Sequence, residues 1–234
     1  MKNAFKFKQF EIDQTDCAMR INTDGVLLGA IATKENAGRI LDIGTGTGVI
    51  ALMLAQRFPD ALVDAVEIDG PAAKAAARNA EKAIFSTRLK VLHTAIEDYT
   101  STEPYDLIVS NPPYFVNDLK NPEYRKGVAR HTDSLFFEQM LKRVDMLLNE
   151  GGHFWFILPV KQAESTISIA ADYGLFPAEI IHLHSDESKD EFRQIVCLNY
   201  STTQVKHRNL YIYAAKGVHT DAYKLLLKDF FLAF

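Results

Sequence analysis

The chain has 234 residues, of which 47% are hydrophobic and 24% charged, with a formal net charge of −4 and a pI of about 6.0. This composition is typical of a globular protein with one sizeable core, and it argues against a protein that coats nucleic acid by charge alone. The sequence has no apolar run of about 18 residues, the minimum for a membrane span, and its cysteines, Cys17 and Cys197, stand in no metal-ligand spacing, so we expect a cytoplasmic protein without disulfides.

Short apolar runs alternate with helical patterns along most of the chain. Strands are predicted at 39–44, 62–67, 89–94, 105–110 and 152–158, helices at 49–58, 71–83, 134–149 and 161–173, and two further strands near 178–184 and 192–200. The helix before Gly151 and Gly152 is expected to end there, because glycine takes left-handed backbone angles easily. This order predicts an α/β protein with a doubly wound, mostly parallel seven-stranded sheet and one antiparallel strand.

The whole chain, 1–234, is predicted to form a single domain. A catalytic core at 38–201 is preceded by an N-terminal extension at 1–37. A C-terminal extension at 202–234 follows, with a strand at 209–213 and a helix at 220–234.

A glycine-rich loop, Gly44-Thr-Gly46-Thr-Gly48, joins the first predicted strand to its helix. In a doubly wound sheet, ligands bind at the carboxyl ends of the strands, and glycines there let the backbone approach them. NAD, FAD and S-adenosylmethionine all use such loops, but a dinucleotide fingerprint needs glycine at position 49, which is Val49 here. The spacing favours S-adenosylmethionine, and the Asp42 carboxylate is placed to receive the ammonium of a bound amino acid.

One acidic residue closes the second predicted strand, and others follow the third. Glu67 can accept the ribose hydroxyls of an adenosine group, as an acid at this place does in NAD-binding proteins. Asp98 can accept the adenine amino group, a role for which Glu97 competes, and Ile68 or Ile96 can pack on the ring. Each acid can also be a solvated residue at a strand end or in a surface loop.

The tetrapeptide Asn111-Pro112-Pro113-Tyr114 follows the fourth predicted strand. The two prolines stiffen the loop and remove two backbone donors, so the loop presents acceptors. The Asn111 side-chain oxygen and the Pro112 carbonyl can accept both N–H bonds of one amine, while Tyr114 stacks on the planar group that carries it. This arrangement is suited to an amine whose lone pair is delocalised. The motif therefore predicts a catalytic site for an exocyclic amine.

The sequence resembles the class I methyltransferases with an Asn-Pro-Pro-Tyr motif and, more closely, the bacterial tRNA(Val) adenine N6-methyltransferases. The closer resemblance is carried by Phe7-Lys-Gln-Phe, Cys17-Ala-Met-Arg, Thr23-Asp-Gly-Val-Leu-Leu-Gly, Ala129-Arg-His and Asp229-Phe-Phe-Leu. It implies a Rossmann-like methyltransferase fold, S-adenosylmethionine as cofactor and the adenine 3′ of the anticodon as substrate. It also implies that Thr23 and Asp24 open a helix that covers the methionine end of the cofactor. From the residues alone, either of them can cap such a helix.

Basic residues after the motif predict contact with tRNA phosphates, namely Arg125, Lys126 and Arg130. No metal is expected, because His182 and His184 share a strand face without a third ligand. The enzyme is expected to be a monomer.

Other functions stay open at this point. A related methyltransferase can act on a protein glutamine or on a guanine amine of ribosomal RNA, since both classes use Asn-Pro-Pro followed by an aromatic residue. A nicotinamide-dependent oxidoreductase or a non-catalytic nucleotide-binding module is a remoter alternative, against which Val49 and the Asn111 motif both count.

Overall fold

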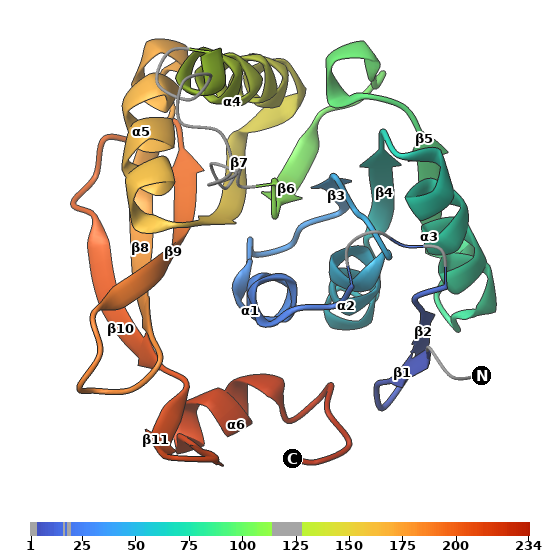
Figure 1. Ribbon diagram of the computed structural model, residues 1–234. Helices are drawn as coiled ribbons and strands as arrows, with labels where there is room; N and C mark the ends of the chain where they lie inside the picture. Colours follow the sequence, from blue (N-terminus) through green and yellow to red (C-terminus); the bar gives the residue numbers. More distant parts are fainter. Residues whose placement is uncertain (1–3, 16, 18–19, 114–127) are drawn as a thin grey trace.

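The computed structural model describes residues 4–15, 17, 20–113 and 128–234, and within the last range it describes side chains from Leu135 onward. Its centre is an eight-stranded sheet (Figure 1). In spatial order the strands are β10 (Lys206–Tyr211), β8 (Phe176–His184), β9 (Glu191–Asn199), β7 (Leu148–Leu158), β6 (Tyr105–Ser110), β3 (Arg39–Ile43), β4 (Leu62–Glu67) and β5 (Leu89–His93). Only β9 runs antiparallel to its neighbours in this sheet.

The predicted fold, a doubly wound and mostly parallel sheet with one antiparallel strand, is confirmed. The sheet has one strand more than the seven predicted. The strand expected in the C-terminal extension is β10, and it pairs in parallel with β8 at the edge of the sheet. The central strands are buried on both faces, which explains why they are near-continuous apolar runs.

Helices cover both faces of the sheet (Figure 1). One hydrophobic cluster packs α1 (Thr23–Ile31) and α2 (Val49–Arg57) on the first face, and a second packs α4 (Val128–Leu147) and α5 (Val160–Ala170) on the other. Helix α3 (Gly70–Lys82) packs mainly against β5. Short 3-10 turns lie at η1 (Ser86–Arg88), η2 (Ile96–Asp98) and η3 (Ala171–Tyr173).

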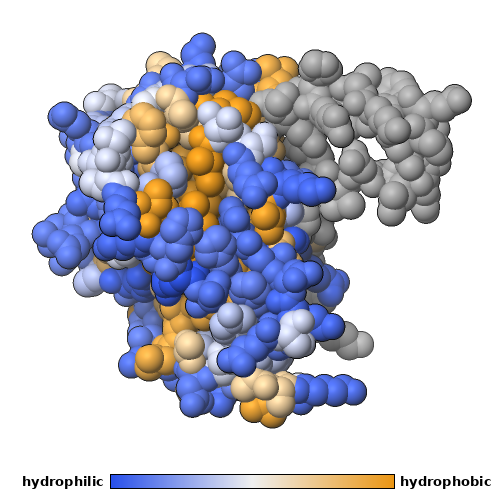
Figure 2. Space-filling view, turned by 90° about the vertical axis from the view of Figure 1, so that its left-hand side faces the viewer, coloured by the Kyte–Doolittle hydropathy of each residue, from blue (hydrophilic) through white to orange (hydrophobic). Residues whose placement is uncertain are grey.

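The edge of the molecule at α5, β8 and β10 is mixed in character. Figure 2 shows hydrophobic residues there in a broken band among hydrophilic ones. Ile167, Ile169 and Ile180 are partly buried residues that pack against the second cluster. Among the described residues, no helix is long and apolar enough to cross a membrane.

The two chain extensions meet at the foot of the molecule in Figure 1. The N-terminal one forms a hairpin of β1 (Ala4–Lys6) and β2 (Glu11–Asp13), and the C-terminal one adds β11 (Tyr213–Ala215), β12 (Val218–His219) and α6 (Asp221–Leu227). An isolated bridge pairs Phe7 with Phe231, and Phe7 belongs to the first hydrophobic cluster. Helix α6 ends at Leu227, well before the predicted end at Phe234.

The prediction that Gly151 and Gly152 end a helix in left-handed angles is wrong. Helix α4 ends at Leu147, both glycines lie inside β7, and neither has a positive φ. A Cβ on Gly152 would lie 2.7 Å from Cδ1 of Leu148 and 2.9 Å from the oxygen of Asn149. Close packing within the strand, rather than a helix end, therefore requires this glycine.

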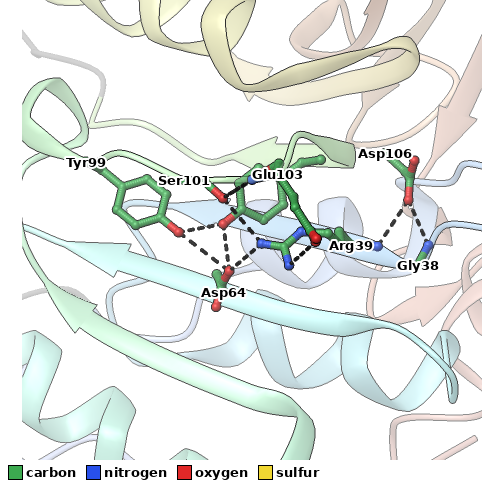
Figure 3. Close-up of polar contacts among 8 residues, drawn as sticks. Gly38, Arg39, Asp64, Tyr99, Ser101, Glu103 and Asp106 are labelled. Atoms are coloured by element: carbon green, nitrogen blue, oxygen red, sulfur yellow. Dashed lines mark hydrogen bonds and ion pairs between the residues drawn. The ribbon is translucent and has the colours of Figure 1, made fainter.

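A partly buried polar network ties the amino ends of the central strands together (Figure 3). Oδ2 of Asp64 accepts from the Tyr105 hydroxyl at 2.6 Å and from Nη2 of Arg39 at 3.4 Å. Burial raises the pKa of the Tyr105 hydroxyl, so the group stays protonated and donates. Oδ2 of Asp106 accepts the backbone N–H groups of Gly38 and Arg39. These contacts stabilise the sheet at the edge opposite to the carboxyl ends of its parallel strands.

Asn79 of α3 joins the N-terminal hairpin to the glycine loop. Its side chain is 1% exposed. Oδ1 accepts from the Asp13 N–H at 2.9 Å, and Nδ2 donates to the carbonyl oxygens of Asp13 at 3.1 Å and Thr47 at 2.9 Å. A single amide thus satisfies three backbone groups from two distant segments.

We expect Asn79→Ala to lower the free energy of unfolding by about 2–4 kcal/mol, because it leaves buried backbone groups unsatisfied. Chemical denaturation measures this loss, with Asn209→Ala at an exposed position as the control. A loss below about 0.5 kcal/mol, as for surface substitutions, would contradict this role of Asn79.

Candidate active site

A cavity of about 310 Å³ lies at the carboxyl ends of β3, β4 and β6. Its lining brings together four segments that the sequence singled out, namely Gly44 and Gly46, Glu67 and Ile68, Ile96 and Glu97, and Asn111 with Pro112 and Pro113. The glycine loop and the Asn111 motif are more than sixty residues apart in the chain, and the sheet places them in one site.

The pairing of β3 with β6 explains this convergence. The last residues of the two strands, Ile43 and Ser110, are partners in the parallel ladder. The Ser110 hydroxyl, which is 1% exposed, donates to the Ile43 carbonyl at 3.0 Å. The loops that follow both strands therefore start side by side.

The glycines of the loop have two different tasks. Gly44 and Gly46 have φ values of 70° and 56°, line the cavity, and have no atom within 4 Å of a Cβ built on them. A side chain at either place would project into open space that a ligand can use. Gly48 does not line the cavity, but its Cβ would lie 3.4 Å from Cα of Ala76, so it permits close packing of α3.

Glu67 lies at the end of β4 and is 8% exposed. Oε2 accepts the Gly46 N–H at 2.8 Å, and Oε1 accepts the Asp69 N–H at 2.9 Å. An ionised carboxylate offers about four acceptor positions, so both oxygens can still accept hydroxyl groups. This geometry supports the predicted ribose contact and also shows that Glu67 holds the glycine loop.

The apolar part of the cavity is suited to a planar ring. Ile68 is 70% exposed on its rim, and Ile96 lines it as a buried residue. Glu97 lines the cavity, whereas Asp98 is exposed and lies outside the lining, so the geometry favours Glu97 for an amino group and leaves the role of Asp98 a prediction. Phe136 of α4 also lines the cavity, and no sequence pattern had marked it.

Asp42 is fully buried beneath the glycine loop. Oδ2 accepts from the Thr45 hydroxyl at 2.6 Å and from the Ala51 N–H at 3.1 Å, so it binds the first turn of α2. Oδ1 has no hydrogen-bond partner among the described residues. The pKa of the Asp42 carboxyl is raised to about 7, mainly by burial and to a smaller extent by the charge of Glu67, while the bonds from Thr45 and Ala51 act in the opposite direction.

Thr23 and Asp24 begin α1 but do not cap it. The cap is Asn22, whose Oδ1 accepts the Gly25 N–H at 2.8 Å, so the expectation that Thr23 or Asp24 caps the helix is wrong. Thr23 is exposed, Asp24 is buried, and neither lines the cavity. Their predicted contact with the cofactor stays a prediction.

Several predicted site residues lie outside the described part of the chain. These are Tyr114, Arg125 and Lys126, together with the side chain of Arg130. The histidines are placed elsewhere: Nδ1 of His182 lies 2.7 Å from Oε1 of Glu191, and Nδ1 of His184 lies 2.9 Å from the oxygen of Lys189. Within the described residues, no group of three metal-ligating side chains is found.

The cavity fits the predicted cofactor, S-adenosylmethionine. Because Gly44 and Gly46 have no side chains, the loop leaves room for the methionine part of the cofactor. Glu67 offers acceptors for the ribose of the cofactor. Ile68 and Ile96 offer apolar contact to its adenine. Oδ1 of Asp42, which has no partner among the described residues, is a buried acceptor beneath the loop that would hold its methionine end. Asp42 is not part of the cavity lining, so its contact with the ammonium group stays a prediction.

We expect Asp42→Asn to stabilise the protein without cofactor, and more so as the pH rises. Between about 3.8 and 7 the unfolded chain is ionised at Asp42 while the folded chain is still protonated, so stability falls with rising pH in this window. Because asparagine does not titrate, the variant avoids this loss of unfolding free energy, which is on the order of 3 kcal/mol. Denaturation at the two ends of the window measures it, with the exposed Asp60→Asn as control. An equal effect at both pH values would contradict the raised pKa.

We expect Glu67→Ala to weaken binding of S-adenosylhomocysteine by about 1.5–3 kcal/mol, the range for hydrogen bonds to charged groups. Glu67→Gln keeps one acceptor oxygen and should lose less. Calorimetry measures the affinity, and Glu81→Ala at an exposed position of α3 is the control. Unchanged affinity in Glu67→Ala would refute the ribose contact.

Comparison with known proteins connects this site to a family. The family model of the methyltransferase small domain matches residues 17–174. The chain is 72% identical to the tRNA1(Val) (adenine(37)-N6)-methyltransferase of Pedobacter heparinus over the full length of both proteins. It is 40% identical to the protein of the same name from Aeromonas hydrophila over 231 residues, 98% of each chain.

Solved structures agree on the fold. A predicted O-methyltransferase from Agrobacterium tumefaciens superposes with a TM-score of 0.71 at 21% identity, over 88% of this chain and 96% of that one. A glycopeptide N-methyltransferase complexed with S-adenosylmethionine gives a TM-score of 0.56 at 11% identity, over 78% of this chain and 100% of that one. The predicted methyltransferase fold is thus confirmed. The chain belongs to the methyltransferase small domain family and, within it, to the family of the tRNA1(Val) (adenine(37)-N6)-methyltransferases.

Proposed function

We propose that this enzyme transfers a methyl group from S-adenosylmethionine to the exocyclic N6 amine of an adenine in tRNA, the adenine 3′ of the anticodon of tRNA(Val). The observation that carries the proposal is the shared cavity, which the glycine loop and Asn111, Pro112 and Pro113 line together. The names of the full-length relatives support the choice of substrate.

The chemistry rests on two acceptors at the end of β6. The lone pair of an aromatic amine is delocalised, so the nitrogen is a poor nucleophile. In the proposed complex the Asn111 side-chain oxygen and the Pro112 carbonyl accept its two N–H bonds, which favours a more tetrahedral nitrogen and directs its lone pair. Such positioning can contribute about 7–11 kcal/mol to lowering a barrier. The proton leaves to solvent after transfer, and no strong base is needed.

Other residues bind and orient the two substrates. S-adenosylmethionine supplies an activated methyl group, and Glu67, Ile68 and Ile96 would hold its adenosine end in the cavity. A stacked loop base must leave its stack to reach Asn111, which costs a few kcal/mol. In this proposal Tyr114 recovers part of that cost by stacking.

Phosphate contacts to Arg125, Lys126 and Arg130 would contribute further binding energy. Because the proposed substrate is a tRNA, we place the enzyme in the cytoplasm, and we keep the prediction of a monomer.

A direct experiment compares substrates. The purified enzyme is incubated with labelled S-adenosylmethionine and unmodified tRNA, ribosomal RNA or release-factor protein, and the nucleosides or peptides are analysed by mass spectrometry. Label in N6-methyladenine of tRNA supports the proposal. Label only on guanine or on protein glutamine would refute the adenine assignment and leave the methyltransferase fold and cofactor untouched.

We expect Asn111→Ala to lower kcat by at least about 100-fold, the order of magnitude for removing one positioned polar group from an active site. Affinity for S-adenosylhomocysteine should change by less than about 0.5 kcal/mol, because the proposed contact is to the amine. Asn149→Ala is the control, since this exposed residue bonds Asp106 at the start of β6. Equal losses of cofactor affinity and turnover in Asn111→Ala would count against the assigned role.

A further inference from the structure

A largely buried ion pair fixes the start of α1. Asp24 is the second residue of this helix, and its Oδ2 accepts from Nε of Arg193 on β9 at 2.9 Å. The side chains of Asp24 and Arg193 are only 11% and 19% exposed, although 169 residues separate them in sequence. Asp24 has no capping task, because Asn22 is the N-cap. The carboxylate is thus held by a strand far along the chain.

The first turn of α1 packs on the proposed catalytic side chain. A Cβ on Gly25 would lie 3.6 Å from Nδ2 of Asn111, 3.5 Å from Oδ1 of Asn22 and 3.7 Å from Cδ1 of Ile50. The backbone of Gly25 is therefore next to the amide end of Asn111. A shift of this turn would change the space in which the Asn111 amide is held.

The rest of α1 is held independently of the ion pair. Nη1 of Arg57 donates to the carbonyl oxygens of Gly29 at 3.0 Å and Ala32 at 2.6 Å, at the carboxyl end of the helix. A Cβ on Gly29 would lie 2.9 Å from Sδ of Met53, so α1 and α2 pack closely there. Because apolar packing and Arg57 hold the helix, loss of the ion pair should leave α1 folded and release mainly its first turn.

Arg193 lies at the edge of the sheet where the cavity opens. Strand β9 is antiparallel, and its Gln194 pairs with Leu158, the last residue of β7. The neighbouring Arg193 is therefore at the carboxyl ends of the parallel strands, on the side of Asn111. A buried ion pair is weak evidence for stability, since apolar residues of similar volume often stabilise a fold equally well. Its place beside the active site indicates a different task.

We propose that Arg193 is a positioning residue for methyl transfer. Its guanidinium holds Asp24, Asp24 fixes the first turn of α1, and Gly25 in that turn keeps the Asn111 amide in place to accept the substrate amine. This inference rests on the proposed function of Asn111. Arg193 itself needs no contact with the substrate or the cofactor in this account.

The test compares Arg193→Met, Asp24→Asn and the double variant, at saturating tRNA and S-adenosylmethionine. Each single variant should lower kcat at least about tenfold, because a misplacement of about 1 Å can cost about 100-fold. The double variant should lose no more than the larger single loss, since both changes break one unit. Arg193→Lys should recover part of the activity. In Arg193→Met, the KM for tRNA and the affinity for S-adenosylhomocysteine should stay within about threefold.

Arg208→Met is the matched control. It breaks the ion pair between Nε of Arg208 and Oε1 of Glu179, which is 2.7 Å long and joins β10 to β8 at the sheet edge. This variant should keep its kcat.

A spectroscopic measurement follows Asn111 directly. The side-chain amide resonances of Asn111 in a ¹⁵N-labelled protein are identified by their loss in Asn111→Ala. They should shift in Arg193→Met and stay in place in Arg208→Met. This readout does not depend on which substrate is methylated.

The outcomes separate the alternatives. A higher KM for tRNA with unchanged kcat would make Arg193 an RNA contact, and a lower melting temperature with unchanged kcat would make it a structural residue. Either result would overturn the inference, as would additive losses in the double variant or unshifted Asn111 resonances. If the parent enzyme is inactive on tRNA but the resonances shift as expected, the proposed substrate is refuted and the positioning by Arg193 stands.

Discussion

The parallel pairing of β3 with β6 is the constraint on which the rest of the site depends. Ile43 and Ser110 end the two strands at the same level, and the Ser110 hydroxyl closes the junction. The glycine loop follows one strand and Asn111 follows the other. A register slip of one residue would move Asn111 by about 3.3 Å, whereas misplacement by about 1 Å already costs about 100-fold in rate. The hydrogen bonds between β3 and β6 thus keep Asn111 in a defined position relative to the glycine loop.

Buried and partly buried carboxylates at the two edges of the sheet differ in how fully they are hydrogen-bonded. At the amino edge, Asp64 accepts hydrogen bonds from tyrosine hydroxyls and an arginine, so its charge is compensated within the protein. At the carboxyl edge, Asp42 keeps an oxygen without a partner among the described residues. Buried polar groups are costly when unpaired. This costly oxygen lies beneath the glycine loop, of which Gly44 and Gly46 line the cavity.

The segments outside the core act on the site through packing. Asn79 bonds the N-terminal hairpin to the glycine loop, and the ion pair of Asp24 with Arg193 fixes the first turn of α1. The bridge of Phe7 with Phe231 joins the two extensions. These contacts make the position of α1 and of the loop depend on residues from both ends of the chain. A core cut at residues 38 and 201 would lose them.

The sequence by itself determined the central strands, the glycine loop and the Asn111 motif, because apolar runs, glycine spacing and paired prolines act over a few residues. It did not determine that β10 joins the sheet, that Glu97 lies in the cavity while Asp98 does not, or that Asn22 caps α1. Which acidic side chain faces the cavity and which residue caps a helix depend on the exact backbone angles of a turn. Whether a strand joins the sheet depends on which edge of the sheet is unpaired. The contacts of Phe136 with the cavity and of Arg193 with Asp24 were decided only by the tertiary structure. These contacts join segments far apart in the chain, and the local sequence does not indicate which distant side chain will lie next to a given residue.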